Sequence, residues 1–359
     1  MNSIPRSPLT AMLSLFAVAT AAVLTGCGGS STPPTPKFTQ IVSFGDSLSD
    51  VGTYRVGTVA ALGGGEFTIN GPNNEIWVQD LASVLNLPAP CAAETGLDGS
   101  AQAGFSVPAT MHAGCFDYAQ GGARVTNPVG PGNALLGGSN AILGLLTVPV
   151  STQVQNYLTA NNGTFTGKEL VTVWAGANDL FIQADTVAAN AETPTQAAQA
   201  MAQAATELAT YINMEILGKG ANYVLVLDLP DVSLTPFGMA QPAAAQPFIA
   251  QLVSTYNQAL QAGLASAPAS KLLWVDAYTL SQTEATNATT YGLTNITTPA
   301  CNLSPTVNPL SSSLVCSAAN LSGTNVLNYE YADDVHPTPY AHALLAKAIL
   351  MQMTQQGWY

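Results

Sequence analysis

Short apolar runs recur along the chain, separated by longer stretches of mixed composition. Four of them are rich in leucine and β-branched residues, and they span residues 40–44, 170–175, 223–228 and 271–276. Nearly continuous apolar runs of this length are typical of strands in a parallel sheet that is covered on both faces. A further strand is predicted near residues 115–119.

Stretches with helical periodicity alternate with these runs. The clearest is alanine-rich and ends at Gly218 and Gly220, which are stop signals for a helix. Helices are predicted over residues 75–86, 150–160, 193–220, 245–263 and about 340–353. Strands that alternate with helices predict an α/β fold, with a doubly wound, mostly parallel sheet and helices on both of its faces.

Residues 39–359 are long enough for one large domain with a sizeable core. Four long stretches inside it have no clear periodicity: residues 52–74, 88–115, 126–148 and 281–330. Structureless loops of this length are uncommon in compact domains and often form lids or binding loops.

The N-terminus has the pattern of an export signal. Arg6 precedes a short apolar run that ends in small residues at Cys27. Residues 24–27 (LTGC) resemble a bacterial lipobox, which implies cleavage after residue 26 and acylation of Cys27. The alternative is an ordinary signal peptide that is cut nearby, with Cys27 an incidental thiol. A Gly/Ser/Thr/Pro-rich tether over residues 27–38 favours the lipoprotein reading, and with it an exported protein of the bacterial cell envelope.

Four further cysteines indicate two disulfide bonds, because an exported chain with an even number of cysteines usually pairs them. Three pairings are possible. We favour Cys91–Cys115 and Cys301–Cys316, because each bond closes a local loop in a stretch that is poor in regular structure. The alternative of buried free thiols is less compatible with export. The chain has no CxxC and only three histidines, so no metal site is predicted.

The formal net charge of the chain is −13, with only 8 basic residues. No basic patch is available to bind a phosphate backbone, which argues against nucleic acid as a partner. The same charge disfavours strong electrostatic binding to anionic membranes, so contact with the membrane is expected only through an N-terminal lipid anchor. We expect a soluble monomer beyond that anchor.

A catalytic base is sought among the three histidines. His112 lies between two of the paired cysteines, and His342 lies within the last predicted helix, where packing or surface exposure explains it. His336 is different, because Pro337 keeps it out of helical geometry just before that helix. Asp333 and Asp334 precede it closely, and an acid there can orient the imidazole toward a hydroxyl group, as in a Ser-His-Asp triad.

Four blocks in order resemble the GDSL, or SGNH, hydrolase family. They are FGDSLSD (44–50), DYAQGGA (117–123), WAGANDL (174–180) and DDVHPT (333–338). Segments near residues 229–236, 256–260 and 291–301 resemble its lipase-like branch. The resemblance spans nearly the whole chain beyond the tether and implies a flavodoxin-like three-layer sandwich. The GxSxG motif of the α/β-hydrolases is absent.

The resemblance implies a role for each matching residue. Ser47 is the nucleophile, His336 the base and Asp333 the acid that orients it. The oxyanion hole uses the backbone N–H groups of Ser47 and Gly122 and the side-chain amide of Asn178. Gly121 is the alternative to Gly122.

Other acids in these blocks are expected to support the structure. Asp117 stands where the family usually has asparagine, which alters a supporting hydrogen bond. Asp46 and Asp50 are expected to hold the loop around the nucleophile, and Asp179 to be structural.

The predicted function is therefore ester hydrolysis by an exported esterase or lipase that forms an acyl-enzyme and needs no cofactor or metal. Two alternatives remain open. One is a phospholipase or phospholipid acyltransferase of the same fold, in which an alcohol can replace water as acceptor. The other is a surface binding protein that has lost turnover. Acyl-chain length and leaving group cannot be derived, because they depend on the long loops.

Overall fold

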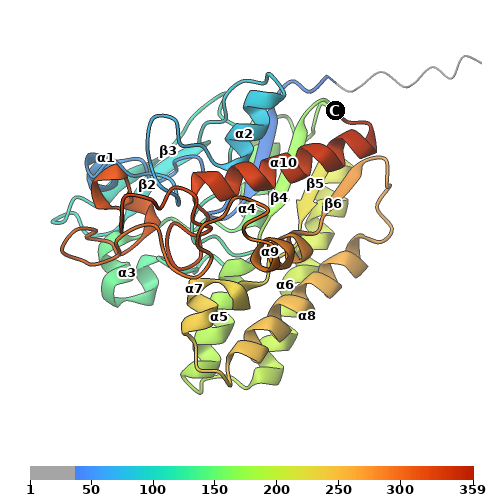
Figure 1. The fold of residues 1–359 in the computed structure, drawn as a ribbon. Coiled ribbons are helices and arrows are strands. Elements are labelled where there is room, and N and C mark those ends of the chain that lie inside the picture. Colours follow the sequence, from blue (N-terminus) through green and yellow to red (C-terminus); the bar gives the residue numbers. More distant parts are fainter. Residues whose placement is uncertain (1–36) are drawn as a thin grey trace, which may run out of the picture. The chain divides into compact units, whose positions relative to one another are not determined.

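The four apolar runs form one parallel sheet (Figure 1). The computed structural model describes residues 37–359. The strands of the sheet, in their spatial order, are β1 (Ile41–Gly45), β4 (Leu170–Trp174), β5 (Val224–Leu227) and β6 (Leu272–Val275). Every neighbouring pair is parallel, with Phe44 opposite Val173 in the first pair. The predicted strands and the α/β fold class are confirmed.

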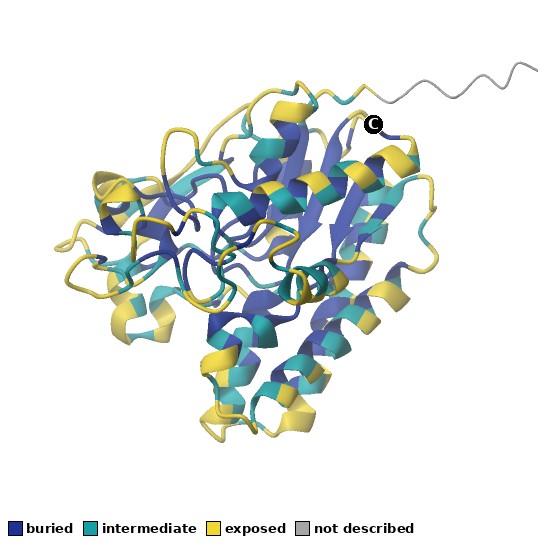
Figure 2. Cartoon of the chain, in the orientation of Figure 1, coloured by how far each residue is buried: buried dark blue, intermediate teal, exposed yellow. Residues whose placement is uncertain are grey.

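Helices cover both faces of the sheet. The long helices are α2 (Trp77–Val84), α4 (Val150–Ala160), α5 (Ala177–Ala188), α6 (Pro194–Tyr211), α8 (Gln246–Leu264), α9 (Ala277–Thr286) and α10 (Pro339–Gln356). Alternate strand residues enter two different cores. Val42 and Phe44 pack with α4, α5, α6 and α8, whereas Ile41 and Leu170 pack with α2 and α10. Figure 2 shows most residues of the four strands as buried. Because successive strand residues face opposite sides of the sheet, both faces are covered, which explains why the runs are apolar without alternation.

The helix predicted over residues 193–220 is divided into three consecutive helical segments. Helix α6 begins with Thr193 as its cap and Pro194 at its first position. A π-helical turn, η2 (Ile212–Ile216), and a 3-10 turn, η3 (Leu217–Lys219), then complete the helical stretch before Gly220. The other four predicted helices match α2, α4, α8 and α10 to within a few residues.

The strand predicted near residues 115–119 is reduced to a single bridge. Asp117 pairs in parallel with Ser43 of β1, and on its other side with Ala92. The Tyr118 N–H donates to the Ser43 carbonyl (2.9 Å), so the segment runs beside β1. It is short because it lies between the disulfide-bonded Cys115 and the turn that contains Gly122.

The stretches predicted to be irregular hold short elements instead. Residues 88–115 contain an antiparallel hairpin, β2 (Glu94–Asp98) and β3 (Ser106–Met111). Most side chains of β3 are exposed, so no apolar alternation marks the hairpin in the sequence. The remaining short elements are α1 (Gly57–Ala61), η1 (Ala134–Leu136), α3 (Gly138–Leu143), η4 (Val232–Leu234), α7 (Pro236–Ala240), η5 (Ser313–Val315) and η6 (Ala318–Asn320).

Both predicted disulfide bonds are present, Cys91–Cys115 and Cys301–Cys316. The predicted signal peptide and Cys27 lie outside the described residues, as does all of the predicted tether except its last two residues. Within residues 37–359, the structure contains no helix with the length and apolar character needed to cross a bilayer.

Candidate active site

The serine of the first block lies on a tight turn at the carboxyl end of β1. Gly45 ends the strand, and a Cβ there would lie 2.4 Å from the Trp174 carbonyl oxygen of β4, so a side chain is excluded. The Ser49 N–H donates to the Asp46 carbonyl (3.1 Å) and closes the turn. Ser47 sits inside this turn, at the edge of the sheet where ligands bind in open α/β folds.

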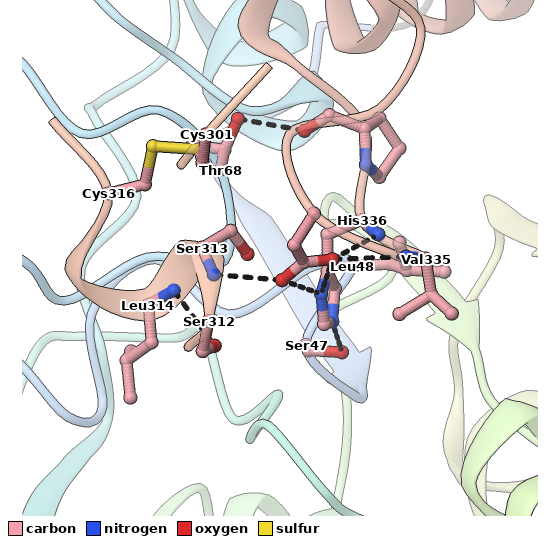
Figure 3. A network of polar contacts seen from close by, with 12 residues as sticks. Ser47, Leu48, Thr68, Cys301, Ser312, Ser313, Leu314, Cys316, Val335 and His336 are labelled. Carbon is pink, nitrogen blue, oxygen red and sulfur yellow. Dashed lines mark hydrogen bonds and ion pairs between the residues drawn. A yellow bond between two sulfur atoms is a disulfide. The ribbon is translucent and has the colours of Figure 1, made fainter. Parts of the chain in front are cut away.

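Ser47, His336 and Asp333 form a continuous chain of hydrogen bonds (Figure 3). The distance from Ser47 Oγ to His336 Nε2 is 2.8 Å, and His336 Nδ1 lies 2.8 and 2.9 Å from the two carboxylate oxygens of Asp333. An ionised carboxylate only accepts hydrogen bonds, so Nδ1 carries a proton and its N–H donates a hydrogen bond to Asp333. Nε2 of the neutral ring is then the acceptor for the Ser47 hydroxyl.

His336 is held in place from several sides. Thr338 caps α10 by accepting from the Ala341 N–H (3.2 Å), and Pro339 is the first residue of the helix. The His336 ring also packs against the ring of Phe67, with 5.0 Å between the centroids. These contacts fix the ring on the short turn that precedes α10.

Asp333 is buried and accepts several hydrogen bonds from the backbone. The N–H groups of Ser313, Val335 and His336 all donate to its carboxylate, at 2.8 to 3.0 Å. Burial alone would raise the pKa of Asp333, but the charge on His336 and these hydrogen bonds hold it well below its usual value. Asp334 is exposed, and only Asp333 contacts the imidazole among these two acids.

The loop that contains Ser313 is itself tied down. Cys316 is bonded to Cys301, and Figure 3 shows this disulfide close to Ser313 and the Asp333 network. The side-chain amide of Asn70 lies 3.1 Å from the Ser313 carbonyl oxygen and 3.0 Å from that of Cys316. The sequence gives no signal for these contacts, because both partners lie in stretches without periodicity.

The backbone N–H groups of Ser47 and Gly122 are both free within the described part of the chain. Neither the Ser47 N–H nor the Gly122 N–H has a hydrogen-bond acceptor among residues 37–359. The Gly121 N–H, by contrast, donates to Asp50 (2.9 Å). Gly122 has a φ of +79°, and a Cβ there would lie 2.2 Å from the Pro131 carbonyl oxygen. Of the two glycines, Gly122 is therefore the one with a donor to offer a ligand.

Asn178 and Asp179 lie in the first turn of α5, directly after β4. Asn178 Nδ2 donates one hydrogen to the Ala123 carbonyl (2.9 Å), which leaves its second hydrogen available. Asp179 binds Arg124 Nε (2.9 Å) and the Val125 N–H (3.0 Å). Hydrogen bonds and an ion pair thus connect the block at residues 174–180 to the segment that follows Gly122.

The other acids of these blocks hold the local structure. Asp50 accepts from Gly52, Thr53 and Gly121, and so connects the turn after β1 to the glycine pair. Burial raises the pKa of Asp117 well above its usual value. A protonated Asp117 has both a donor and an acceptor, as an asparagine would.

Asp46 is buried next to Ser47 and forms no salt bridge within residues 37–359. Its Oδ1 accepts from the Leu48 N–H (3.1 Å), and its Oδ2 has no partner among the described residues. Burial raises the pKa of Asp46 from 3.8 to about 7. The carboxyl group is therefore mostly protonated below neutral pH and supports the turn without taking part in the chain of hydrogen bonds to His336.

The substitution Asp46→Asn should remove a pH-dependent part of the stability. The unfolded chain loses this proton near pH 3.8 and the folded protein only near pH 7, so the free energy of unfolding falls as pH rises between these values and levels off above them. The total loss is up to about 4 kcal/mol. Urea unfolding at pH 5 and pH 8 measures the part of this loss that occurs above pH 5, about 3 kcal/mol.

We expect the free energy of unfolding of the wild type to fall more between pH 5 and pH 8 than that of Asp46→Asn, because the amide does not titrate. The exposed Asp98, replaced in the same way, is the control and should follow the wild type. Identical pH dependence in the wild type and Asp46→Asn would contradict this account of the turn.

The other two histidines lie elsewhere. His112 is exposed, and its Nε2 lies 2.8 Å from the Thr95 hydroxyl. His342 is fully buried in α10, so the packing interpretation fits it better than surface exposure. Over residues 37–359, the structure shows no cluster of three or more His, Cys, Asp or Glu side chains arranged to hold a metal ion.

A small pocket of about 30 Å³ opens beside Ser47 and His336. We call it the Ser47 pocket. Its wall is mostly apolar, and the other residues that line it are Leu48, Ala177, Phe181, Pro230, Val232, Thr235 and Val335. An uncharged group bonded to Ser47 Oγ would enter an apolar environment there.

Comparison with known proteins places this geometry in a family. No curated protein matches the chain. Two solved structures cover most of it at low identity. One is LAE5, described as an alpha/beta hydrolase enzyme from the metagenome of Lake Arreo, Spain (12% identity, TM-score 0.44, 90% of this chain and 97% of that one). The other is the lipase Lip_vut3 from a goat rumen metagenome (14% identity, TM-score 0.38, 88% and 97%).

The family match covers the sheet, the turn with Ser47 and most of α10. The model of the family described as GDSL-like Lipase/Acylhydrolase matches residues 41–349. It includes all four sequence blocks and both disulfide bonds, and so spans nearly all of the described residues. The chain therefore belongs to the family of GDSL-like lipases and acylhydrolases.

Proposed function

We propose that this protein is a serine ester hydrolase that works through a Ser47-His336-Asp333 triad and a covalent acyl-enzyme. The observation that carries the proposal is the chain of hydrogen bonds from Ser47 Oγ through His336 to Asp333, each within 2.9 Å. Family membership supports an esterase or lipase type of hydrolase. The hydrogen-bond geometry supports Ser47 as the nucleophile, His336 as the base and Asp333 as the acid that orients the base.

The first half of the reaction acylates the serine. His336 Nε2 accepts the proton of the Ser47 hydroxyl as Oγ attacks the ester carbonyl carbon. Asp333 stays ionised, since its pKa is held low, and stabilises the imidazolium that forms. The imidazolium then gives its proton to the departing alcohol, and the acyl group remains on Ser47 Oγ.

The second half returns the enzyme to its resting state. His336 accepts a proton from a water molecule that attacks the acyl-enzyme carbonyl carbon, and it then protonates Ser47 Oγ as the acid leaves. Negative charge develops on the carbonyl oxygen in both halves. The N–H groups of Ser47 and Gly122 and the second amide hydrogen of Asn178 are the proposed donors to this oxygen. Each donor is typically worth about 3–4 kcal/mol in the transition state.

The cellular setting remains a prediction of the sequence. The two disulfide bonds are consistent with an exported protein. We propose that the protein acts in the bacterial cell envelope or outside the cell, attached through a lipid on Cys27 and otherwise soluble. Its substrates are then acyl esters or lipids that are accessible outside the cytoplasm.

Product analysis on a simple ester tests this function against its alternatives. The purified protein is incubated with p-nitrophenyl butyrate, with and without an added alcohol, and the acid and any new ester are quantified. We expect one equivalent of free acid for each p-nitrophenol released, with or without the alcohol. Transfer of most acyl groups to the alcohol would instead support an acyltransferase, and the absence of turnover on any ester would support a binding protein.

A further inference from the structure

A second cavity lies next to the Ser47 pocket and has no role in the reaction described so far. We call it the His342 cavity. Its volume is about 80 Å³, and it is bounded by β4, α9, α10 and the segment that leads to His336. Leu48, Pro230, Thr235 and Val335 line both spaces. The two spaces therefore meet at these four residues.

The character of the wall indicates which part of an ester enters the cavity. Apolar side chains form most of it, with Trp174 at the sheet, Leu280 on α9 and Leu345 on α10. In the acyl-enzyme mechanism the alcohol leaves first, while the acyl group stays bound to Ser47 until water releases it. A small, mostly apolar space near Ser47 suits the acyl group, which stays bound to the enzyme. Burial of the methylene groups of the acyl chain holds the acyl-enzyme in position.

The volume limits the length of that acyl chain. A methylene group is close in size to a water molecule, which occupies about 30 Å³ in the liquid, so a cavity of about 80 Å³ holds roughly three carbon atoms. The Ser47 pocket adds space for about one more. With the carbonyl carbon, which stays bonded to Ser47 Oγ, this makes an acyl chain of about five carbon atoms, so an acyl group the size of pentanoate or hexanoate is near the limit of the two spaces.

One polar side chain in this wall is left without a partner. His342 is 1% exposed, and neither of its ring nitrogens has a hydrogen-bond partner among the described residues. Burial, together with a smaller effect of the charge on His336, lowers the pKa of His342 to about 3. The ring is therefore neutral and has one N–H donor and one bare acceptor nitrogen. A buried polar group without a partner destabilises the fold, so this pair of groups favours a polar ligand atom beside it.

Two acids extend the polar part of the same wall. Glu284 on α9 and Glu330 are partly buried and line the His342 cavity. Burial raises the pKa of Glu284 to about 7 and that of Glu330 to about 8. Glu330 Oε2 has no hydrogen-bond partner among residues 37–359. The cavity therefore combines an apolar surface with several groups that are able to bind a neutral oxygen atom.

We propose that the His342 cavity receives the acyl chain of a short ester and that His342 hydrogen-bonds a hydroxyl or keto oxygen carried by that chain. The proposal rests on the ester hydrolase function above and adds the substrate class to it: esters of short oxygenated acids. His342 is then a specificity-determining residue. It contacts the substrate away from the carbonyl carbon that reacts.

Three methyl esters of equal chain length test the role of His342. They are methyl hexanoate, methyl 3-hydroxyhexanoate and methyl 5-oxohexanoate, with kcat/KM measured for each. We expect the wild type to prefer at least one oxygenated ester over hexanoate by about tenfold. His342→Leu, which keeps a similar volume and loses both polar groups, should abolish that preference. His342→Gln keeps a donor and an acceptor and should retain most of it.

A substitution that fills the cavity tests the placement of the acyl chain independently. Ala277 lies in the cavity wall at the start of α9. Ala277→Leu should lower kcat/KM on methyl hexanoate relative to methyl acetate by about tenfold, because acetate leaves the cavity empty. Melting temperatures of all the variants identify any that fail to fold.

The outcomes separate this proposal from the proposed function. If His342→Leu keeps the wild-type ratios among the three hexanoates, or if Ala277→Leu lowers acetate and hexanoate turnover equally, the substrate proposal is overturned while the triad stands. If the wild type shows no preference for either oxygenated ester, His342 binds only water and the proposal is also overturned. Hydrolysis of methyl acetate that survives Ser47→Ala would overturn the function itself.

Discussion

Replacing Ser47 by alanine is expected to lower kcat for ester hydrolysis by about 10⁴- to 10⁶-fold, with little change in stability. The serine hydroxyl is the only proposed group that forms a bond to the substrate, so its loss removes the acyl-enzyme path entirely. The residual rate comes from binding and from the donors to the oxyanion. Initial rates on p-nitrophenyl butyrate, with active protein quantified by its unfolding transition, provide the measurement.

Ser49 provides a matched control two residues further along the same turn. It is 1% exposed, and its hydroxyl has no hydrogen-bond partner among the described residues. Ser49→Ala should therefore keep kcat within about twofold of the wild type. Loss of activity in both variants would point to damage of the turn, and full activity in Ser47→Ala would refute the assignment of the nucleophile.

Replacing Asp333 by asparagine is expected to lower kcat by about 10⁴-fold, the size of effect typical for the acid of such a triad. An amide nitrogen facing His336 Nδ1 would favour the tautomer with its proton on Nε2, which cannot accept from Ser47. The carboxylate also accepts from the N–H groups of Ser313, Val335 and His336. One of these donors would face the new amide hydrogens, so we expect an additional loss of about 1–3 kcal/mol in the free energy of unfolding.

The neighbouring Asp334 is the control for this substitution. It is exposed, and no side-chain hydrogen bond joins it to the imidazole. Asp334→Asn should therefore hydrolyse p-nitrophenyl butyrate at nearly the wild-type rate. The assignment of the acid would be wrong if the two substitutions had similar effects on kcat. Asp333→Asn retains Ser47, so a loss of kcat in this variant reports on the orientation of His336 and not on loss of the nucleophile.

The central sheet follows from the sequence because burial on both faces leaves a direct pattern. Residues 170–175 are apolar at nearly every position, and Leu170 and Val171 pack into different cores. The β2–β3 hairpin leaves no such pattern, because β3 is mostly exposed and only its Val107 packs against a buried cluster. The sequence does not predict helix α5, for a different reason. The helix starts at Ala177, directly after β4, and its first turn contains Asn178 and Asp179. A turn at the end of a strand would have the same composition.

The candidate site divides in a similar way. Ser47 and His336 lie in short blocks with fixed neighbours, so each could be predicted from the chain alone. The groups that hold Asp333 could not, since the Ser313 N–H is a backbone donor that any residue type supplies. Asn70 supports the same loop by donating to the carbonyl oxygens of Ser313 and Cys316, which lie 243 and 246 residues away in the sequence. The sequence predicts only a packing or surface role for His342, because neither burial without a partner nor a cavity wall has a signature in a single sequence.

Labelling with a fluorophosphonate tests the central claim most directly, because this reagent forms a stable bond only with an activated serine. The folded protein is treated with the reagent, digested, and searched for the adduct by mass spectrometry. We predict one adduct, on Ser47, that is absent from Ser47→Ala and at least a hundredfold slower to form in a variant with alanine at His336. An adduct on another serine, or ester hydrolysis by a protein that is not labelled at Ser47, would contradict the account.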